Sequence, residues 1–191
     1  VYKCTPLSRL NAADGMATPL AQAAYEKFYE TLGGKPVHHT LATHWARLIE
    51  LLYSAERWVE LATDPEITSQ EYRVLPTETP TEGVGCVEAP RGTLTHHYAT
   101  DERGIVTKAN LIVGTTNNNA PICMSVKKAA QGLIKNGEVN EGLLNMVEMA
   151  FRAYDPCFGC ATHNLPGQMP LEIRLRDQEG NVVQRLSQYV D

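Results

Sequence analysis

The sequence has 191 residues, of which 43% are hydrophobic and 20% are charged, and its formal net charge is −5 at pH 7. A chain of this length can build one domain with a buried core. The acidic balance and scattered basic residues argue against a nucleic-acid-binding protein, which clusters positive charge to neutralise phosphates. No apolar run reaches the roughly 18–20 residues of a membrane-spanning helix.

The chain opens at Val1-Tyr2-Lys3-Cys4, without an initiator Met and without the charged and apolar pattern of a secretory signal. We interpret this opening as that of a fragment or a trimmed chain. The expected location is cytoplasmic.

Two helices are expected in the first third of the chain. Thr18-Pro19 provides an N-cap followed by proline at the first helical position, and Gly33-Gly34 ends the helix that spans Leu20 to Leu32. A second helix runs from about Thr40 to Ala62 and ends at Asp64-Pro65. Its dense apolar stripe at i, i+3 and i+4 spacing predicts a core helix. Nearby histidines are expected to be solvated or packed rather than metal ligands: His38, His39 and His44.

Extended structure is expected in the middle of the chain. The Pro-, Thr- and Gly-rich segment Pro76–Gly85 predicts a loop. Two β-compatible runs, Val84–Tyr98 and Ile105–Val113, flank the polar turn Asp101–Gly104. This arrangement predicts one hairpin.

The last third returns to helices and ends in a second hairpin. The loop Thr115–Asn119 offers Asn and Thr side chains that can cap a helix from about Ala120 to Ile134, and Asn140 caps a final helix. Two short alternating runs, Leu171–Leu175 and Val182–Leu186, predict a small hairpin. The predicted fold class is therefore mainly α and helical bundle-like, with a small β-hairpin region.

One pair of cysteines has the spacing of a metal or redox site. Cys157 and Cys160 form a C-x-x-C motif whose thiolates suit soft metals such as zinc, nickel, copper or iron in Fe–S clusters. Zinc usually needs a second pair of ligands, and a thioredoxin-like motif follows a strand rather than a helix. The spacing alone leaves a metal site, a redox pair and a structural role open. The other cysteines are expected to be small buried residues: Cys4, Cys86 and Cys123.

A second candidate site is the segment Glu88-Ala89-Pro90-Arg91-Gly92, followed by His96-His97. A Pro-Arg-Gly sequence at the end of an extended run presents a permanently charged guanidinium with limited freedom. Such a group could bind the anionic ligands of a metal. The alternative is a surface arginine paired with Glu88 or an aspartate.

Several segments, taken in chain order, resemble the large catalytic subunit of nickel–iron hydrogenases. The resemblance covers nearly the whole chain and is closest to the soluble, cytoplasmic, methyl-viologen-reducing group, which implies a partial large-subunit fold. The matching segments are PLSRLNAADGM (Pro6–Met16), LATHWARLIELL (Leu41–Leu52), EAPRGTLTHHY (Glu88–Tyr98), NLIVGTTNNN (Asn110–Asn119) and DPCFGCATH (Asp155–His163).

The resemblance implies roles around a Ni–Fe centre whose iron carries carbon monoxide and cyanide. It assigns Cys157 as a terminal nickel ligand and Cys160 as a thiolate that bridges nickel and iron. Arg91 would lie above the open metal position, Pro90 would line the pocket of the diatomic ligands, and Thr115 would donate to a cyanide.

The resemblance also implies how the chain ends. Asp155 would pair with Arg91 and orient it. His163 would end the mature form of the protein and would contribute to a buried metal site for Mg or Fe. Residues 1–163 would then be the C-terminal part of the catalytic domain, and residues 164–191 an extension that maturation removes.

The implied parent enzyme splits dihydrogen reversibly into protons and electrons. Heterolysis needs a Lewis acid and a base, and Cys157 or Arg91 could be the base. The family's N-terminal C-x-x-C motif and its neighbouring acid are absent, so this chain alone is expected to be inactive. Implied partners are a maturation chaperone, a C-terminal endopeptidase, dihydrogen and an Fe–S small subunit. The rival interpretations are a non-catalytic hydrogenase-like scaffold or assembly partner, and a zinc or redox C-x-x-C protein.

Overall fold

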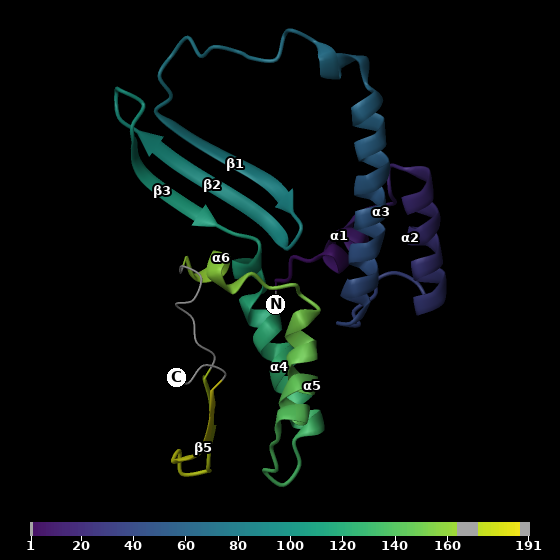
Figure 1. Ribbon diagram of the computed structural model, residues 1–191, viewed down its shortest axis with the longest axis vertical. Coiled ribbons are helices and arrows are strands. Elements are labelled where there is room, and N and C mark those ends of the chain that lie inside the picture. Colours follow the sequence, from purple (N-terminus) through teal and green to yellow (C-terminus); the bar gives the residue numbers. More distant parts are fainter. Residues whose placement is uncertain (1, 164–171, 188–191) are drawn as a thin grey trace. The chain divides into compact units, whose positions relative to one another are not determined.

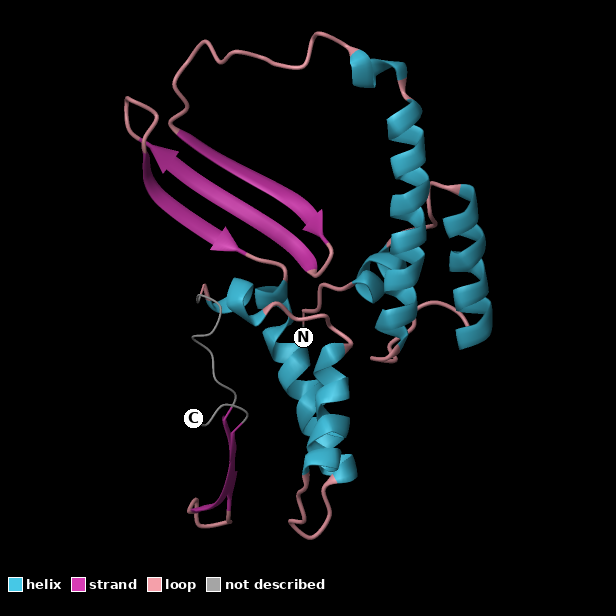
Figure 2. Ribbon diagram, viewed as in Figure 1, coloured by secondary structure: helices cyan, strands magenta, loops and turns pink. Residues whose placement is uncertain are grey.

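The computed structural model describes residues 2–163 and 172–187. The chain divides into two compact units, Val1–Pro156 and Cys157–Asp191, and each is described by itself (Figure 1). Helices and strands both contribute to the first unit (Figure 2). Its elements are α1 (Pro6–Ala12), α2 (Pro19–Leu32), α3 (Ala42–Thr63), the 3-10 helix η1 (Pro65–Thr68), β1 (Glu82–Ala89), β2 (Gly92–Thr100), β3 (Val106–Ile112), the 3-10 helix η2 (Thr115–Asn118), α4 (Asn119–Leu133) and α5 (Glu141–Arg152).

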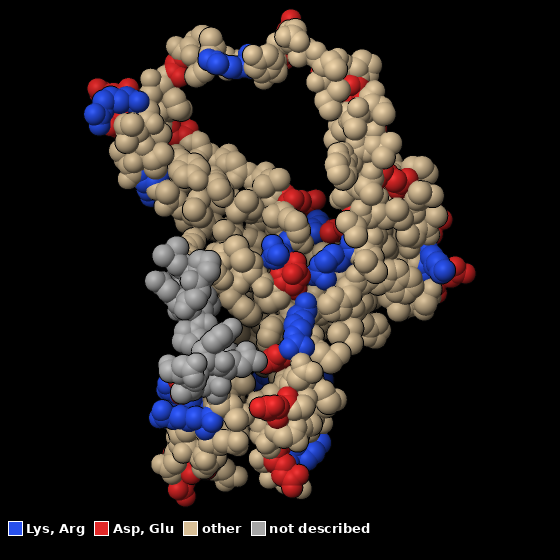
Figure 3. Space-filling view, viewed as in Figure 1, with Lys and Arg blue, Asp and Glu red and all other residues tan. Residues whose placement is uncertain are grey.

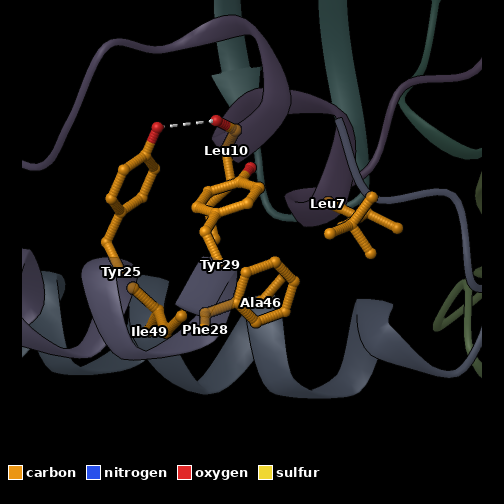
Figure 4. Packing of buried hydrophobic residues seen from close by; sticks show 8 residues of the cluster. Leu7, Leu10, Tyr25, Phe28, Tyr29, Ala46 and Ile49 are labelled. Carbon is orange, nitrogen blue, oxygen red and sulfur yellow. Dashed lines mark hydrogen bonds between the residues drawn. The ribbon is translucent and has the colours of Figure 1, made fainter. Parts of the chain in front are cut away.

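The buried core lies among the first three helices. Aromatic rings of α2 meet edge to face, with centroids 5.0 Å apart between Phe28 and Tyr29 and 5.1 Å apart between Phe28 and Trp45 of α3. The Tyr25 hydroxyl donates to the carbonyl of Leu10 on α1, so the aromatic cluster fixes α1 as well (Figure 4). The buried cluster consists of Leu7, Leu10, Tyr25, Phe28, Tyr29, Val37, Ala46 and Ile49.

The N-terminus of α2 is capped by a neighbouring helix rather than by its own N-cap side chain. The helix begins at Pro19 after Thr18, as predicted, but the Thr18 side chain makes no capping bond to the helix. The carboxylate of Glu56 on α3 instead accepts from the backbone N–H groups of Leu20 (3.0 Å) and Ala21 (2.9 Å) and from the Thr18 hydroxyl (2.6 Å). An anion at the positive end of a helix dipole ties α2 to α3.

The strands form a three-stranded antiparallel sheet in the order β1-β2-β3. Ala89 pairs with Gly92, so Pro90-Arg91 is a two-residue turn. The single predicted run Val84–Tyr98 was therefore wrong: it is two strands joined by this turn. The alternation of β-compatible residues continues through the turn and conceals it.

Helix α3 has the predicted bounds to within two residues, but only its first half contributes to the core. Its buried residues are Thr43, Ala46 and Ile49. Trp58 is 76% exposed, and the view in Figure 3 shows few charged side chains along this helix. The apolar stripe predicted the helix correctly but gave no information on what covers it. The other large exposed apolar residues of α3 are Leu48, Leu51, Val59 and Leu61.

The remaining helices and the second hairpin follow the sequence pattern closely. The predicted loop at Thr115–Asn119 is instead largely the 3-10 helix η2, which leads directly into α4. Asn140 caps α5 as predicted, because its side-chain oxygen accepts from the N–H of Leu143 at 2.9 Å. None of the helices in the described ranges has both the length and the apolar character required to span a bilayer.

The second unit contains α6 (Phe158–Thr162) and an antiparallel hairpin of β4 (Glu172–Arg176) and β5 (Val182–Ser187). This hairpin was predicted, although Leu171, its expected first residue, lies outside the described residues. Taken together, the described elements form a mixed α and β structure, so the mainly helical prediction was too narrow. The missed strand pairing accounts for the difference.

Replacing Glu56 with Gln is expected to destabilise the chain at neutral pH and progressively less in acid. Burial opposes ionisation, but the bonds from Thr18, Leu20 and Ala21 outweigh it and lower the pKa of Glu56. A lowered folded-state pKa stabilises above the unfolded-state value of roughly 4.3, and this contribution is lost as the pH falls through the folded-state value. Urea denaturation from pH 7 to pH 3 measures the difference.

The matched control is Glu60→Gln on the same helix. Glu60 pairs with Arg57 on the surface of the same helix. A loss of stability in Glu56→Gln that is equal at pH 7 and pH 3, or equal to that of Glu60→Gln, would contradict the capping role.

Candidate functional site

The turn that carries Arg91 can adopt its shape because glycine follows it. Gly92 has φ +143°, a conformation that other residues rarely adopt. A Cβ at Gly92 would lie 2.9 Å from the Cβ and carbonyl oxygen of Cys4 and 2.9 Å from the carbonyl oxygen of Gly114. Close approach of three backbone segments therefore requires glycine here.

The turn directs Arg91 to the residue that precedes Pro156-Cys157 in the chain. Arg91 Nε donates to the carbonyl oxygen of Asp155 at 2.6 Å, and the Asp155 carboxylate lies 3.2 Å from the same nitrogen. Both side chains are partly exposed, at 40% and 45%. The structure thus brings together two residues that lie 64 positions apart. Their catalytic roles stay a prediction.

The backbone of Asp155 is in an uncommon conformation. Its φ is +50°, and its N–H donates to the Arg152 carbonyl at 2.9 Å at the end of α5. Such a conformation costs about 1–3 kcal/mol for a residue with a side chain. It allows both the carbonyl and the carboxylate of Asp155 to face Arg91, so one residue supplies two acceptors to one guanidinium.

Thr115 lies in the same unit, next to this turn. It begins η2, is 3% exposed, and follows Gly114, whose backbone approaches Gly92. Pro90, which directly precedes Arg91 in the chain, is exposed. Three of the predicted site residues, Arg91, Asp155 and Thr115, therefore lie around a single backbone crossing.

The C-x-x-C motif belongs to the second unit, at the start of α6. Cys157 is the N-cap of this short helix, and its sulfur accepts from the Cys160 N–H at 3.4 Å. The two sulfurs are bonded as a disulfide. His163 ends α6 in a left-handed conformation and is exposed. Reduction of the pair would free two thiols on one turn.

The donor chemistry of the chain suits a soft metal but supplies only part of a complete ligand set. Two thiolates three residues apart can bind the same ion. Across the described residues, no group of three or more His, Cys, Asp or Glu side chains is arranged to hold a metal. Cys157 and Cys160 thus offer two thiolates, and the described residues add no further ligand beside them.

Two residues that the sequence did not single out hold the Arg91 turn. Arg9 is paired with Glu50 through two contacts of 2.6 Å and donates to the carbonyls of Ala89 and Pro90. Asn118 is 1% exposed and donates to the carbonyl of Arg91. No periodicity reveals such long-range contacts. The sequence could have pointed to these two residues only because both lie in segments that resemble the hydrogenase large subunit, Pro6–Met16 and Asn110–Asn119.

Charged side chains of both signs lie beside the turn, namely Arg9, Arg47, Glu50 and Glu88. Burial opposes the charged form of Arg9, but the hydrogen bonds and negative charge of Glu50 prevail and raise its pKa. Arg47 lies on α3, as Glu50 does, and burial lowers the pKa of Arg47. Arg47 Nη2 donates to the carbonyl of Ala153 at 3.0 Å, while its buried Nε has no hydrogen-bond partner among the described residues. These arginines border an open cavity of about 540 Å³ that Pro90 also lines.

The thiol of Cys4 lies directly behind the turn. Its sulfur contacts the Thr93 hydroxyl at 3.1 Å and the Tyr2 hydroxyl at 3.1 Å, and it accepts from the Thr93 N–H at 3.3 Å. Burial would raise the pKa of Cys4, but these hydrogen bonds outweigh burial and lower it. The prediction of a simple buried cysteine was therefore wrong for Cys4, which is only half-buried and hydrogen-bonded. It was also wrong for Cys86 and Cys123, which are exposed.

Comparison with known proteins identifies the class. The model of the nickel-dependent hydrogenase family matches residues 2–163. The chain therefore belongs to the nickel-dependent hydrogenase family, and the resemblance inferred from the sequence is confirmed.

Two curated relatives show how much of a hydrogenase subunit this chain covers. The chain is 53% identical over 190 residues to an F420-non-reducing hydrogenase iron-sulfur subunit of Archaeoglobus profundus, covering 99% of this chain and 39% of that protein. It is 46% identical over 181 residues to the NAD-reducing hydrogenase HoxS subunit beta of Cupriavidus necator, covering 93% of this chain and 37% of that protein. The chain thus spans about two-fifths of the length of these relatives.

A solved structure shares the fold. A crystal structure of an NAD+-reducing [NiFe]-hydrogenase in the H2-reduced state matches with a TM-score of 0.79 and 44% sequence identity. The match covers 85% of this chain and 36% of that chain. The described elements therefore reproduce a share of a hydrogenase fold rather than a chance arrangement.

Alkylation of the metal-free, air-oxidised chain under denaturing conditions is expected to modify three cysteines, because Cys157 and Cys160 are paired while Cys4, Cys86 and Cys123 are free. Reduction before alkylation should raise the number to all five. Mass spectrometry of the intact chain counts the added groups. Five modified cysteines before reduction would contradict the pairing, and Cys157→Ala should give four in both conditions.

Proposed function

We propose that this chain is the C-terminal part of the catalytic subunit of a nickel–iron hydrogenase, and that the complete subunit splits dihydrogen reversibly into protons and electrons. The observation that carries the proposal is the contact between Arg91 Nε and Asp155, 2.6 Å to the carbonyl and 3.2 Å to the carboxylate. It joins the turn of the Pro-Arg-Gly segment to the start of the Asp-Pro-Cys-x-x-Cys segment. Membership of the nickel-dependent hydrogenase family supports the same interpretation.

Arg91 and Asp155 are proposed to work as one unit. The guanidinium is always charged and has donors on three nitrogens, of which Nε is used by Asp155. Within the described residues its hydrogen bond is made through Nε, so the terminal nitrogens are the proposed donors to the cyanide ligands of the iron. Because Asp155 fixes the plane of the guanidinium, the remaining donors are oriented before substrate arrives.

Cys157 and Cys160 are proposed to hold the Ni–Fe centre after reduction, together with two further thiolates from the part of the catalytic protein that this chain does not cover. When bound, the centre supplies the Lewis acid for heterolysis of dihydrogen. The N–H of Cys160 already donates to the sulfur of Cys157, which stabilises a thiolate there. Cys157 is the proposed proton-accepting group, because the guanidinium of Arg91 is already protonated, and Thr115 is the proposed donor to a cyanide.

Residues 164–191 are proposed to be a maturation extension that an endopeptidase removes after His163. Two observations support this boundary: the family model ends at residue 163, whereas similarity to the Archaeoglobus profundus protein covers 99% of the chain. The extension is thus shared with a relative but lies outside the family's matched region. His163 would contribute to a Mg or Fe site in the mature protein. The proposed partners are a maturation chaperone and an Fe–S small subunit, in a cytoplasmic enzyme of the methyl-viologen-reducing group.

The proposal is tested on the complete subunit, produced with its maturation proteins and small subunit. We expect dihydrogen-driven dye reduction and infrared bands of carbon monoxide and cyanide. Both should disappear in Cys157→Ala and Cys160→Ala and persist in Cys123→Ala, whose exposed thiol is a matched control. Arg91→Lys should lower the rate by about 100-fold, the effect of removing one preorganised donor.

The control for Arg91→Lys is Arg103→Lys, because Arg103 also pairs with an aspartate, Asp101, but lies in the β2–β3 turn. A correctly cleaved, folded and assembled enzyme without activity or infrared bands would refute the proposal. That outcome would favour the non-catalytic hydrogenase-like scaffold.

A further inference from the structure

Three consecutive backbone carbonyls of the Arg91 turn accept hydrogen bonds from distant side chains. Arg9 Nη1 donates to the carbonyl of Ala89 at 2.9 Å, and Arg9 Nη2 donates to that of Pro90 at 3.1 Å. Asn118 Nδ2 donates to the carbonyl of Arg91 itself at 2.8 Å. The carbonyls of the two central residues of a β-turn take no part in the i to i+3 hydrogen bond that closes it. Here they are bound by side chains from α1 and from the end of η2.

Arg9 can hold the turn because its own position is fixed. Its Nε and Nη2 each lie 2.6 Å from a different oxygen of Glu50 on α3. A bidentate pair of this kind fixes the plane of the guanidinium. The remaining N–H groups of Arg9 then point at the turn. One side chain therefore connects the turn to Glu50 on α3.

Asn118 is committed entirely to backbone groups around the turn. Its Oδ1 accepts from the Cys4 N–H at 2.9 Å, and its Nδ2 donates to the Cys4 carbonyl at 2.7 Å and the Arg91 carbonyl at 2.8 Å. These two short bonds use both hydrogens of the amide. The Gly114 carbonyl at 3.4 Å is a weaker third contact. Although Asn118 precedes α4, its side chain does not cap that helix.

We propose that Arg9 and Asn118 are positioning residues that fix the Arg91 guanidinium for the hydrogenase reaction by binding the carbonyls of residues 89–91. This inference rests on the proposed function for its kinetic consequence. The side chain of Arg91 contacts Asp155 at one end, and its backbone is held at the other. Fixing both ends leaves the guanidinium little freedom, which is the condition for preorganised donors.

The substitution Asn118→Asp removes both donors at nearly constant volume and sets an oxygen against two carbonyls. Arg9→Lys keeps the charge, but one ammonium group cannot serve Glu50 and two carbonyls in the same geometry. Asn145→Asp is the matched control for the first, because Asn145 lies on α5 and its side-chain oxygen accepts from Arg152 rather than contacting the turn. Arg57→Lys, on the surface of α3, is the control for the second.

The experiment uses the complete enzyme, with the catalytic protein bound to its partners. Turnover per bound nickel and the KM for dihydrogen are measured for each variant, together with hydrogen–deuterium exchange of a peptide spanning residues 87–95. We expect kcat per nickel to fall about 10- to 100-fold in Asn118→Asp and Arg9→Lys, with KM within about twofold of wild type. Exchange should rise in this peptide, and both controls should match wild type.

A role limited to folding would lower nickel loading but leave kcat per loaded nickel unchanged, and that result would overturn the proposal. Equal exchange in the variants and their controls would overturn it as well. If Asn118→Asp does not assemble, Arg9→Lys decides by the same criteria. If the wild-type complex shows no dihydrogen-dependent turnover, the proposed function fails, and exchange still decides whether these side chains hold the turn.

Discussion

The contact between Arg91 and Asp155 is the constraint on which the candidate site depends. It joins a hairpin turn to the last residue of the first unit before Pro156, 64 positions further along the chain. The geometry requires an uncommon backbone conformation on each side: Gly92 has φ +143°, which the absence of a Cβ permits, and Asp155 has φ +50°, which carries a cost. Residues in such conformations persist where surrounding contacts determine them, and they are concentrated at functional sites. Here those contacts are the bonds from Arg9 and Asn118 to the turn and from the Asp155 N–H to α5.

The sequence predicted α2, α3, α4 and α5 well because their signals are local, whereas the short helices α1 and α6 were not predicted. Thr18-Pro19, Asn140 and Asp64-Pro65 mark helix ends that the structure reproduces to within two residues. The turn at Pro90-Arg91 was missed, since β-compatible residues continue on both sides and the defining feature is the positive φ of Gly92. The resemblance to hydrogenases named Arg91, Asp155 and Thr115. No local pattern reveals that Asn118 binds Cys4 and Arg91, because that contact depends on how distant segments cross.

The exposed apolar surfaces are a second consequence of long-range packing that the sequence does not show. Residues with the spacing of a core helix, such as Leu48, Leu51 and Trp58, are more than half exposed on α3. Strand β1 is likewise exposed along nearly its whole length. The chain spans about two-fifths of the length of its relatives, and patches of this kind typically face another part of a protein. The buried Nε of Arg47 has no hydrogen-bond partner in the described ranges, so it too is a group whose interactions this chain does not complete. The local core among α1, α2 and α3 nevertheless suffices to place the Arg91 turn against α1.

The central claim is that Arg91 and Asp155 act as one unit in the chemistry of a hydrogenase. A double-mutant cycle in the complete, assembled enzyme tests it most directly, with Arg91→Lys, Asp155→Asn and the double variant compared by dihydrogen-dependent turnover per bound nickel. Groups that act together give strongly non-additive effects. The account predicts that the double variant is no slower than the slower single variant. Effects that multiply, so that the double variant loses the product of the two single losses, would show that the two residues act independently and would contradict the account.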